Sequence, residues 1–337
     1  MIPAELLQYA TDRQREIAEA INEHGGAPQA AKILGVNRSY VTRAMQALER
    51  KAIAAGWKPP VEEKPSHGKK IMVVFDTQTR PGDDFSFLAR IGQYAVEKRP
   101  DVIVFIGDHA DMPSLSSYDK GKKSFEGRRY KRDVEAAIEA MAAFHGPIVD
   151  YNAKHKNKPY RPRKVMTLGN HEARISRAIE DDAKLDGVLS LDDLKYKDFG
   201  FEVYPFLEVV VIEGIAFAHY FVTGVAGRPA STAAAQLRKT NMSCVAGHQQ
   251  GKQIAYATRA DGSTITSIIC GSTYEHSEDY LGPQGNKHFR GFLMMHEVRD
   301  GAFDEMWISL GFINSRYAHI QCEPDHSKVP LPELAPR

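Results

Sequence analysis

The sequence predicts an α/β protein with a small all-α unit at its N-terminus. The chain has 337 residues, which is enough for two domains or for one large domain with an appendage. Residues 10–55 place apolar side chains at helical spacing. From residue 71 onward, short apolar β-branched runs alternate with amphipathic stretches, as they do in βαβ units. We therefore expect a helical domain over residues 1–55 and an α/β domain over residues 71–317.

The composition excludes several classes of protein. Hydrophobic residues make up 42% of the chain and charged residues 26%, which is typical of globular proteins and not of collagens, coiled coils or disordered chains. With 44 basic against 43 acidic residues, the chain is not a uniformly basic nucleic-acid coat protein. Its 3 cysteines are far apart and form no CxxC pair, which indicates a reducing compartment. The N-terminus is no signal or transit peptide, and no apolar run reaches the roughly 18 residues of a membrane span. We expect a cytoplasmic protein without a membrane partner, either bacterial or, if phage-encoded, in the host cytoplasm.

The first element is a set of three short helices. A capping box of Thr11 and Gln14 begins the first helix, and Gly25 ends it. The second runs from about Pro28 to Leu34 and the third from about Arg38 to Lys51. Together they form the predicted domain of residues 1–55.

The segment AAKILGVNRSYVTRAMQAL resembles the helix-turn-helix motif of DNA-binding proteins. The small Ala31, the turn residue Gly35, and the apolar Val36 and Val41 stand at the expected offsets. By this resemblance DNA is a partner, and the third helix presents its polar side chains to a major groove: Asn37, Arg38, Ser39, Tyr40, Thr42 and Arg43. The alternative is a three-helix bundle that mediates protein contacts or only caps the α/β domain, because residues 1–65 are nearly neutral, with nine basic against eight acidic side chains.

Residues 56–70 contain three prolines and no apolar periodicity, which predicts an extended linker. Strands at 71–76 and 101–108 then flank a helix near 88–99. A helix at roughly 133–146 precedes a third strand at 164–170. Residues 201–308 are β-rich, and the Pro-rich tail, residues 318–337, is expected to be irregular.

Polar blocks follow the predicted strands. They are FDTQ (75–78), GDHAD (107–111), GNHE (169–172), AHY (218–220) and GHQQ (247–250). Ligand sites in such sheets gather where the strands end, so these loops are expected at one sheet edge. Oxygen donors and imidazoles that converge there suit divalent metal ions.

The order and spacing of these blocks resemble the calcineurin-like metallophosphoesterase superfamily, with its pattern DxH, GDxxD, GNH[DE], a lone His and GHxH. The resemblance covers residues 71 to about 310. It implies a two-sheet β-sandwich flanked by helices and a centre of two divalent metal ions. By the resemblance, Asp108 bridges the ions, while Asn170, His219 and His248 complete one site and Asp76, Gln78 and Gln250 the other. From the residues alone, His219 could also be a strand-end or core histidine.

Two residues depart from the family pattern, and both fall on the same metal. Gln78 and Gln250 stand where the pattern has histidines. An amide oxygen is a weaker and harder donor than imidazole, so we expect this site to prefer Mn²⁺ or Mg²⁺, with Zn²⁺, Ni²⁺ or iron as alternatives. We expect loose binding that can leave the site empty without substrate. The other interpretation is a catalytically inactive fold.

His171 of GNHE is expected beside the phosphate, where it stabilises the transition state or protonates the leaving group. Asp111 is expected to hold its tautomer, with Glu172 in support. His109 occupies a variable motif position and is not expected to bind metal. Contacts to the phosphate or leaving group are assigned to Arg80, His288 and Arg290.

Two basic stretches, residues 119–132 and 154–164, are expected near the site. They are interpreted either as grips for a phosphodiester backbone or as solvated faces. Residues 114–119 and 279–291 are the expected lips of the pocket.

Three functions remain open. The first is a DNA-directed phosphodiesterase or nuclease, an architecture that resembles metallophosphoesterases of bacteriophages and prophages. The second is a phosphatase or phosphodiesterase on a small nucleotide or a phosphoprotein. The third is a DNA-binding regulator with an inactive metallophosphoesterase fold. The sequence leaves oligomerisation open.

Overall fold

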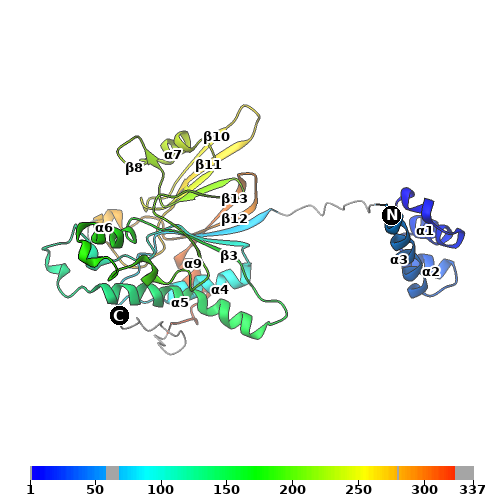
Figure 1. Cartoon of the computed structure of the whole chain (residues 1–337), viewed down its shortest axis with the longest axis horizontal. Helices are drawn as coiled ribbons and strands as arrows, with labels where there is room; N and C mark the ends of the chain where they lie inside the picture. The colour runs from blue at the N-terminus through cyan, green and yellow to red at the C-terminus, as the bar shows by residue number, and fades with distance from the viewer. Residues whose placement is uncertain (1, 58–67, 279–280, 323–337) are drawn as a thin grey trace. The chain divides into compact units, whose positions relative to one another are not determined.

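The computed structural model describes residues 2–57, 68–278 and 281–322. The chain divides into two compact units, Met1–Ser66 and His67–Arg337 (Figure 1). Most of the linker predicted at 56–70 and of the tail predicted at 318–337 lies outside the described residues, as do residues 279 and 280 of one predicted lip.

The first unit consists of a 3₁₀ helix η1 (Ala4–Tyr9) and the helices α1 (Asp12–His24), α2 (Ala27–Ile33) and α3 (Arg38–Ala54). The capping box of Thr11 and Gln14 is confirmed at the start of α1. Gly35, with φ of 66°, turns the chain between α2 and α3, and the next N–H, that of Val36, donates to the carbonyl of Ala31 at 3.0 Å.

Two small clusters of buried side chains hold this unit together. Ile17, Ala31 and Val41 form one cluster, contributed by α1, α2 and α3 respectively. Leu6, Leu48 and Ala52 form the other and join η1 to α3. The small Ala31 therefore lies where all three helices meet.

Two β-sheets form the second unit. The six-stranded sheet has the order β13-β12-β1-β2-β3-β4. Strands β1 to β4 are parallel to one another, and β12 runs antiparallel to both of its neighbours, β1 and β13. The five-stranded sheet has the order β10-β11-β9-β6-β5, and its β6 and β9 are parallel. The predicted two-sheet architecture is therefore confirmed.

The strands of the first sheet are β1 (Lys69–Val74), β2 (Val102–Phe105), β3 (Arg163–Thr167), β4 (Glu202–Tyr204), β12 (Gly291–Arg299) and β13 (Ala302–Ser309). Those of the second are β5 (Val210–Ile212), β6 (Ile215–Ala218), β9 (Cys244–Ala246), β10 (Gln253–Thr258) and β11 (Thr264–Ile269). The short strands β7 (Val222–Thr223) and β8 (Arg228–Pro229) pair as a hairpin.

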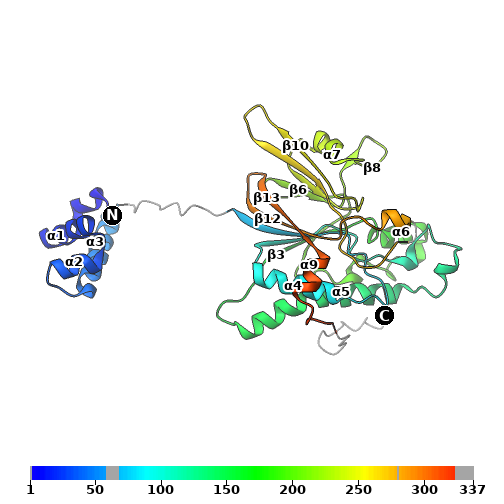
Figure 2. The same ribbon diagram turned by 180° about the vertical axis from the view of Figure 1, so that it is seen from behind.

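Helices flank the two sheets (Figure 2). They are α4 (Ser86–Lys98), α5 (Tyr130–Lys154), α6 (Ala173–Asp181), α7 (Ala233–Thr240), α8 (Gly282–Gly285) and α9 (Leu310–Arg316). In Figure 1, α4 and α5 lie side by side along one sheet while α7 lies beside β10 and β11 of the other, and the inter-element contacts agree. Within the described ranges, no helix has the length and apolar character needed to cross a membrane.

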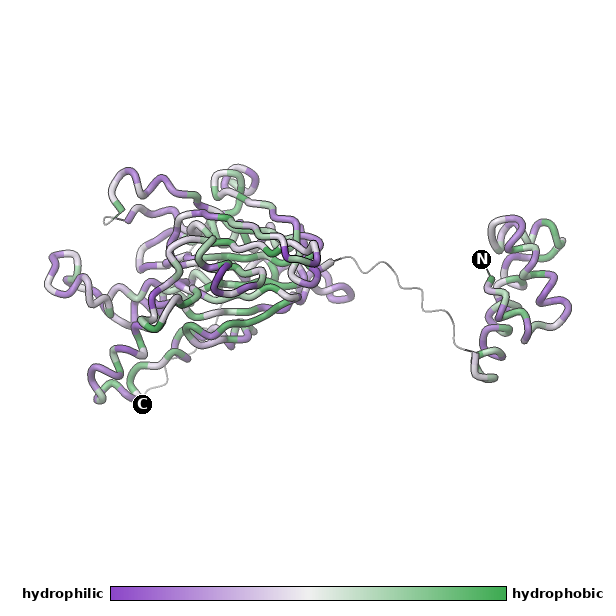
Figure 3. Tube along the Cα trace, turned by 90° about the horizontal axis from the view of Figure 1, so that it is seen from above, coloured by the Kyte–Doolittle hydropathy of each residue, from purple (hydrophilic) through white to green (hydrophobic). Residues whose placement is uncertain are grey.

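The hydrophobic core of this unit is one large cluster of buried side chains from strands of both sheets and from the helices that flank them. β1 and β2 are buried over nearly their whole length, as their apolar β-branched sequences predict. Figure 3 shows apolar residues gathered in the middle of this unit and hydrophilic ones mainly along its outer segments. Because β1, β2 and β3 run parallel, their carboxyl ends meet at one edge, and the predicted polar blocks follow those ends.

Candidate metal centre

The loops at this edge adopt strained backbone conformations. Asp76, Gln78, Asp108, His248 and Gln250 have φ values of 34°, 40°, 49°, 67° and 58°. The left-handed region costs a side-chain-bearing residue about 1 kcal/mol or more. All five belong to the predicted metal-binding blocks, so each of the blocks FDTQ, GDHAD and GHQQ holds at least one residue in this costly conformation.

A glycine within each of two blocks, GNHE and GHQQ, allows the loops to approach one another closely. A Cβ atom on Gly169 would lie 2.1 Å from Oδ1 of Asp108, and one on Gly247 would lie 2.4 Å from Oδ1 of Asp76. Both contacts are too short for any side chain. The glycines of GNHE and GHQQ are therefore required by the packing of loop against loop.

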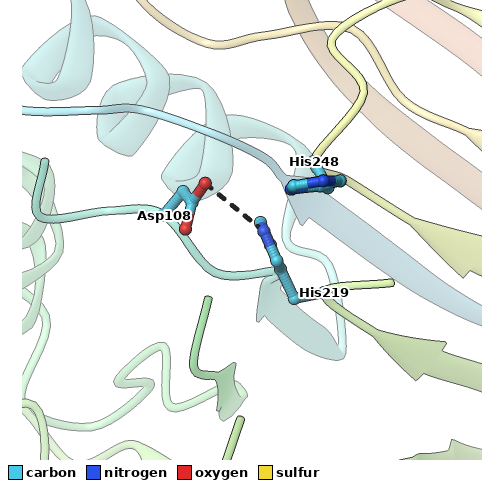
Figure 4. Close-up of side chains that lie close together, drawn as sticks. All are labelled: Asp108, His219 and His248. Carbon is cyan, nitrogen blue, oxygen red and sulfur yellow. Dashed lines mark ion pairs between the residues drawn. The ribbon is translucent and has the colours of Figure 1, made fainter. Parts of the chain in front are cut away.

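Asp108, His219 and His248 offer ligand atoms that all lie within 4.8 Å of one another (Figure 4). Nε2 of His219 lies 3.3 Å from Oδ2 of Asp108, the ion pair that the dashed line marks. Nδ1 of His219 lies 2.9 Å from the carbonyl oxygen of Ile106, a contact in which the nitrogen must donate. This contact turns Nε2 toward the centre, as in histidines that bind metal.

Asn170 completes the cluster. Its Oδ1 lies 2.9 Å from Nε2 of His219 and 2.7 Å from Nδ1 of His248. A carboxylate, an amide oxygen and two imidazoles thus point at one small volume, where a divalent cation would bind them all. The residues present fit the predicted second metal.

Charge interactions within this cluster are strong. Burial raises the pKa of Asp108, but the nearby His171 and His219 outweigh this effect and hold it well below its usual value. Burial lowers the pKa of His219, yet Asp108 raises it overall to about 9. Burial and the neighbouring His219 lower the pKa of His248 to about 4, so its ring is neutral and able to donate a lone pair to a metal.

The predicted first metal site contains two buried oxygens without partners. Oδ1 of Asp76 accepts from the backbone N–H of His248 at 3.1 Å. Oδ2 of Asp76 and Oε1 of Gln78 are buried and have no hydrogen-bond partner among the described residues. Such orphaned oxygens are costly unless a cation or donor meets them, so they fit a metal ion. Burial, strengthened by Asp108, raises the pKa of Asp76 to about 7 against the opposing influence of His219.

Gln250 is arranged differently from Gln78. Its Oε1 accepts a hydrogen bond from the hydroxyl of Tyr274 at 2.7 Å. The ring of Tyr274 in turn stacks on His276 at 4.2 Å. Among the described residues, the amide oxygen of Gln78 therefore has no hydrogen-bond partner, whereas that of Gln250 already accepts a hydrogen bond.

His171 lies beside the cluster. Its backbone N–H donates to Oδ1 of Asp108 at 2.9 Å, and its Nδ1 lies 2.6 Å from Oδ1 of Asp111. Burial lowers the pKa of His171, but Asp108 and Asp111 together raise it above the usual value. This geometry suits a general acid whose orientation is set by a carboxylate.

Glu172 is wholly buried and ties two loops together. Its carboxylate accepts from the backbone N–H groups of Asp108, Ala110 and Gly169 at 3.0, 2.9 and 2.8 Å. The tyrosine hydroxyl of Tyr196 adds a contact at 3.3 Å. Glu172 thus holds together the two loops that follow β2 and β3, which carry Asp108 and Asn170.

Arg174 is a site residue that the sequence motifs did not indicate. One guanidinium nitrogen of Arg174 lies 3.1 Å from Nε2 of His171, and the other donates to the carbonyl of Asp111 at 2.6 Å. Arg174 follows GNHE by two residues in the first turn of α6, which places it one helical turn from His171. The three-residue spacing between His171 and Arg174 is the sequence feature from which a site role of Arg174 could have been predicted.

Protein groups already engage the three side chains assigned to phosphate contacts. Arg80 pairs with the carboxylates of Asp111 and Glu278. His288 contacts Oγ of Ser272 at 2.6 Å and the carbonyl of Gly285 at 2.8 Å. Arg290 donates to the carbonyl of Glu275 at 2.7 Å. Their contacts therefore give no support to a role in binding substrate.

His109 is buried away from the ligand atoms. Its ring contacts the hydroxyl of Thr77 at 2.7 Å and the carbonyl of Ala137 at 3.1 Å. Both ring nitrogens are thus used by the protein, in line with the expectation that His109 does not bind metal.

One basic stretch lies at the wrong end of the sheet for the role expected of it. Residues 154–164 lead into the amino end of β3, whereas the metal cluster lies at the carboxyl ends of the parallel strands. The expectation that this stretch borders the site was therefore wrong. Residues 119–132 follow β2 and precede most of α5, so they begin on the side of the cluster.

The candidate DNA-contacting residues of the first unit are exposed, but several are used within α3. Oδ1 of Asn37 caps the helix and accepts from the backbone N–H of Tyr40 at 2.8 Å. The hydroxyl of Thr42 donates to the carbonyl of Arg38, and Nε of Arg43 to that of Ser39. The predicted set lies together at the N-terminal end of α3, with Asn37 as its cap.

Comparisons with known proteins identify the family of the second unit. A family model described as calcineurin-like phosphoesterase matches residues 69–289. The gene 54 protein of Mycobacterium phage D29 is 33% identical over 97 residues, and that of phage L5 is 34% identical over 96 residues. These matches cover 27% of this chain but only 38% and 37% of the phage proteins, well under two thirds of their lengths.

Solved structures also resemble the chain. They include Yfce, a phosphoesterase from E. coli, with 14% identity, coverage of 72% of this chain and 99% of that chain, and a TM-score of 0.29. TT1561 of Thermus thermophilus has 10% identity, the same coverage of 72% and 99%, and a TM-score of 0.31.

Proposed function

The chain belongs to the calcineurin-like phosphoesterase family, and from this premise we propose that it is a divalent-metal-dependent hydrolase of phosphoesters, acting on phosphodiesters of DNA or of nucleotides. One observation carries the proposal. Asp108, Asn170, His219 and His248 converge on one volume, with the His171–Asp111 pair directly beside it.

Metal ions held there would supply an activated water and would offset the charge on the phosphate. Proton transfer to the leaving group and further neutralisation of charge are assigned to side chains of this chain. The carboxylate of Asp111 lies against Nδ1 of His171, and the guanidinium of Arg174, which can only donate, lies 3.1 Å from Nε2. Nε2 therefore accepts in this geometry. It can give a proton to the leaving oxygen once the ring is protonated and Arg174 turns to the phosphate, where the guanidinium can neutralise developing charge.

The three-helix unit supports a DNA substrate. The N-terminal end of α3 exposes Arg38, Tyr40 and Arg43, which suit phosphate and base-edge contacts. A DNA-binding unit joined to a hydrolase raises the local concentration of DNA at the metal centre. The likeness to phage proteins favours a phage-encoded origin.

The test is hydrolysis of bis-p-nitrophenyl phosphate by the full chain, with and without Mn²⁺. We expect Mn²⁺-dependent turnover that is lost in Asp108→Asn. The matched control is Asp150→Asn, which changes an exposed carboxylate on α5 and should leave the rate unchanged.

The two glutamines favour a second candidate, a DNA-binding regulator with an inactive metallophosphoesterase fold. Amide oxygens bind metals more weakly than imidazoles, and Tyr274 already holds that of Gln250. If no divalent metal supports hydrolysis while the chain binds DNA, this candidate replaces the first.

A further inference from the structure

A large cavity adjoins the metal centre. It has a volume of about 790 Å³ and lies between α6, the segment of residues 190–198 and the segment that follows β4. Sites for small molecules are usually about 300–1,000 Å³. The cavity is thus large enough for a nucleotide-sized group in addition to the phosphate.

The cavity borders the loop that carries the GNHE block. Leu168 and Ala173, which flank GNHE, both line it. Arg177, another lining residue, donates to the backbone carbonyl of Asn170 at 2.8 Å. The cavity therefore lies next to the loop that carries Asn170 and His171, within reach of an ester group of a phosphate held at the metal centre.

Its wall combines an aromatic ring with aliphatic side chains. Phe206, Leu191 and Val203 are half-buried, so each turns apolar surface to the cavity. The Phe206 ring lies 6.2 Å from that of His219 and 5.5 Å from that of Tyr220. The Tyr220 ring lies 4.8 Å from that of His248. An unbroken line of rings thus runs from the metal cluster to the cavity.

The rim is polar and of mixed charge. Arg177, Lys195 and Lys197 line the cavity together with Asp192 and Asp198, and Lys197 pairs with Asp192 at 3.0 Å. Polar and charged groups beside an apolar wall match a ligand that carries both a phosphate and a planar ring.

We propose that this cavity, here termed the nucleoside pocket, binds the nucleoside of a nucleotide phosphodiester while its phosphate occupies the metal centre. The inference rests on the proposed function and narrows its substrate class. The base lies against Phe206 and Leu191, and the cationic side chains of the rim face the phosphate.

The test compares two esters with the same leaving group, the p-nitrophenyl ester of thymidine monophosphate and p-nitrophenyl methyl phosphate. In wild type with Mn²⁺, we expect kcat/KM for the nucleoside ester to be higher by about ten-fold or more, the factor that stacking on one aromatic ring supplies. Leu191→Trp fills the pocket and should abolish this preference while turnover of the methyl ester persists. The matched control is Val188→Trp, at a residue that is 55% exposed and does not line the cavity.

A second readout does not depend on activity. Thymidine alone should raise the Tm of wild type and of Val188→Trp but not that of Leu191→Trp. A wild type that does not distinguish the two esters, or a Leu191→Trp variant that keeps the preference, overturns the nucleoside pocket. If neither ester is hydrolysed with any divalent metal, the proposed function fails, and thymidine stabilisation then decides the pocket by itself: without it, the pocket is refuted as well.

Discussion

Single residues at the metal centre are constrained by contacts between segments that lie far apart in the sequence. The resemblance of the polar blocks to the phosphoesterase pattern selected Asp76, Asp108, Asn170, His219 and His248, which stand at or just after the ends of predicted strands. It could not reveal that Tyr274 holds Gln250, or that Arg80 pairs with Glu278 across 198 residues. Such pairings depend on the path of loops, and no local pattern encodes them.

Gly169 provides the sharpest prediction at this scale. Gly169→Ala would place a Cβ atom 2.1 Å from Oδ1 of Asp108, so one of the two loops has to move. We expect loss of metal-dependent turnover and weaker Mn²⁺ binding, with the chain still folded by circular dichroism.

The matched control for this variant is Gly146→Ala. Gly146 lies inside α5, and no other group stands within 4 Å of the position that a Cβ atom would take there, so alanine should raise helix stability by up to about 1 kcal/mol. Equal Mn²⁺ affinity in Gly169→Ala and wild type would contradict the close approach of the loops.

At the scale of elements, the apolar runs predicted β1, β2 and β3 well because these strands are buried on both faces. β10 lies within the stretch predicted to be β-rich, but its residues are half-buried or exposed, so no apolar run marks where it begins and ends. The helix predicted at roughly 133–146 extends to Lys154 as α5. It continues past Pro147 because Phe144 and Ile148 on its buried face pack into the core.

The contact between α5 and β3 should respond to pH. On α5, Nδ1 of His145 contacts the carbonyl of Met141 at 3.0 Å, and Nζ of Lys164 on β3 lies 3.0 Å from its Nε2. Burial, and then the charge of Lys164, lower the pKa of His145 from 6.5 to about 3. The imidazole is therefore neutral in the folded chain.

The sign of the effect follows from linkage. Below its usual pKa of 6.5 the imidazole takes up a proton in the unfolded chain, but in the folded chain it does so only near 3. Its contribution to the free energy of unfolding is thus lost as pH falls through this window, by at most about 1.4 kcal/mol per pH unit. Urea unfolding at about pH 7 and about pH 5 should show a smaller loss for His145→Gln than for wild type. Identical losses would mean that His145 titrates normally.

The whole molecule has two units, each with a core of its own. The sequence predicted the alternation of strands and helices in the first sheet from local patterns. It could not predict that β6 and β9 lie side by side in a second sheet, which brings His219 and His248 together. Nor could it assign residues 154–164 to the correct edge, since that depends on the direction of β3.

Removal of the first unit should separate catalysis from DNA recruitment. We expect deletion of residues 1–60 to leave hydrolysis of bis-p-nitrophenyl phosphate unchanged, because the second unit contains the whole metal cluster. Cleavage of duplex DNA should weaken, and its dependence on salt should become less steep. Unchanged action on duplex DNA would assign the three-helix unit to another partner.

The central claim is that separated loops of the second unit surround a pair of divalent cations. Equilibrium dialysis of the full chain against Mn²⁺ tests it most directly. We expect two ions per chain, a tighter one that is lost in His248→Ala and a looser one that is lost in Gln78→Ala. Binding of no Mn²⁺, or binding that neither substitution changes, would contradict it.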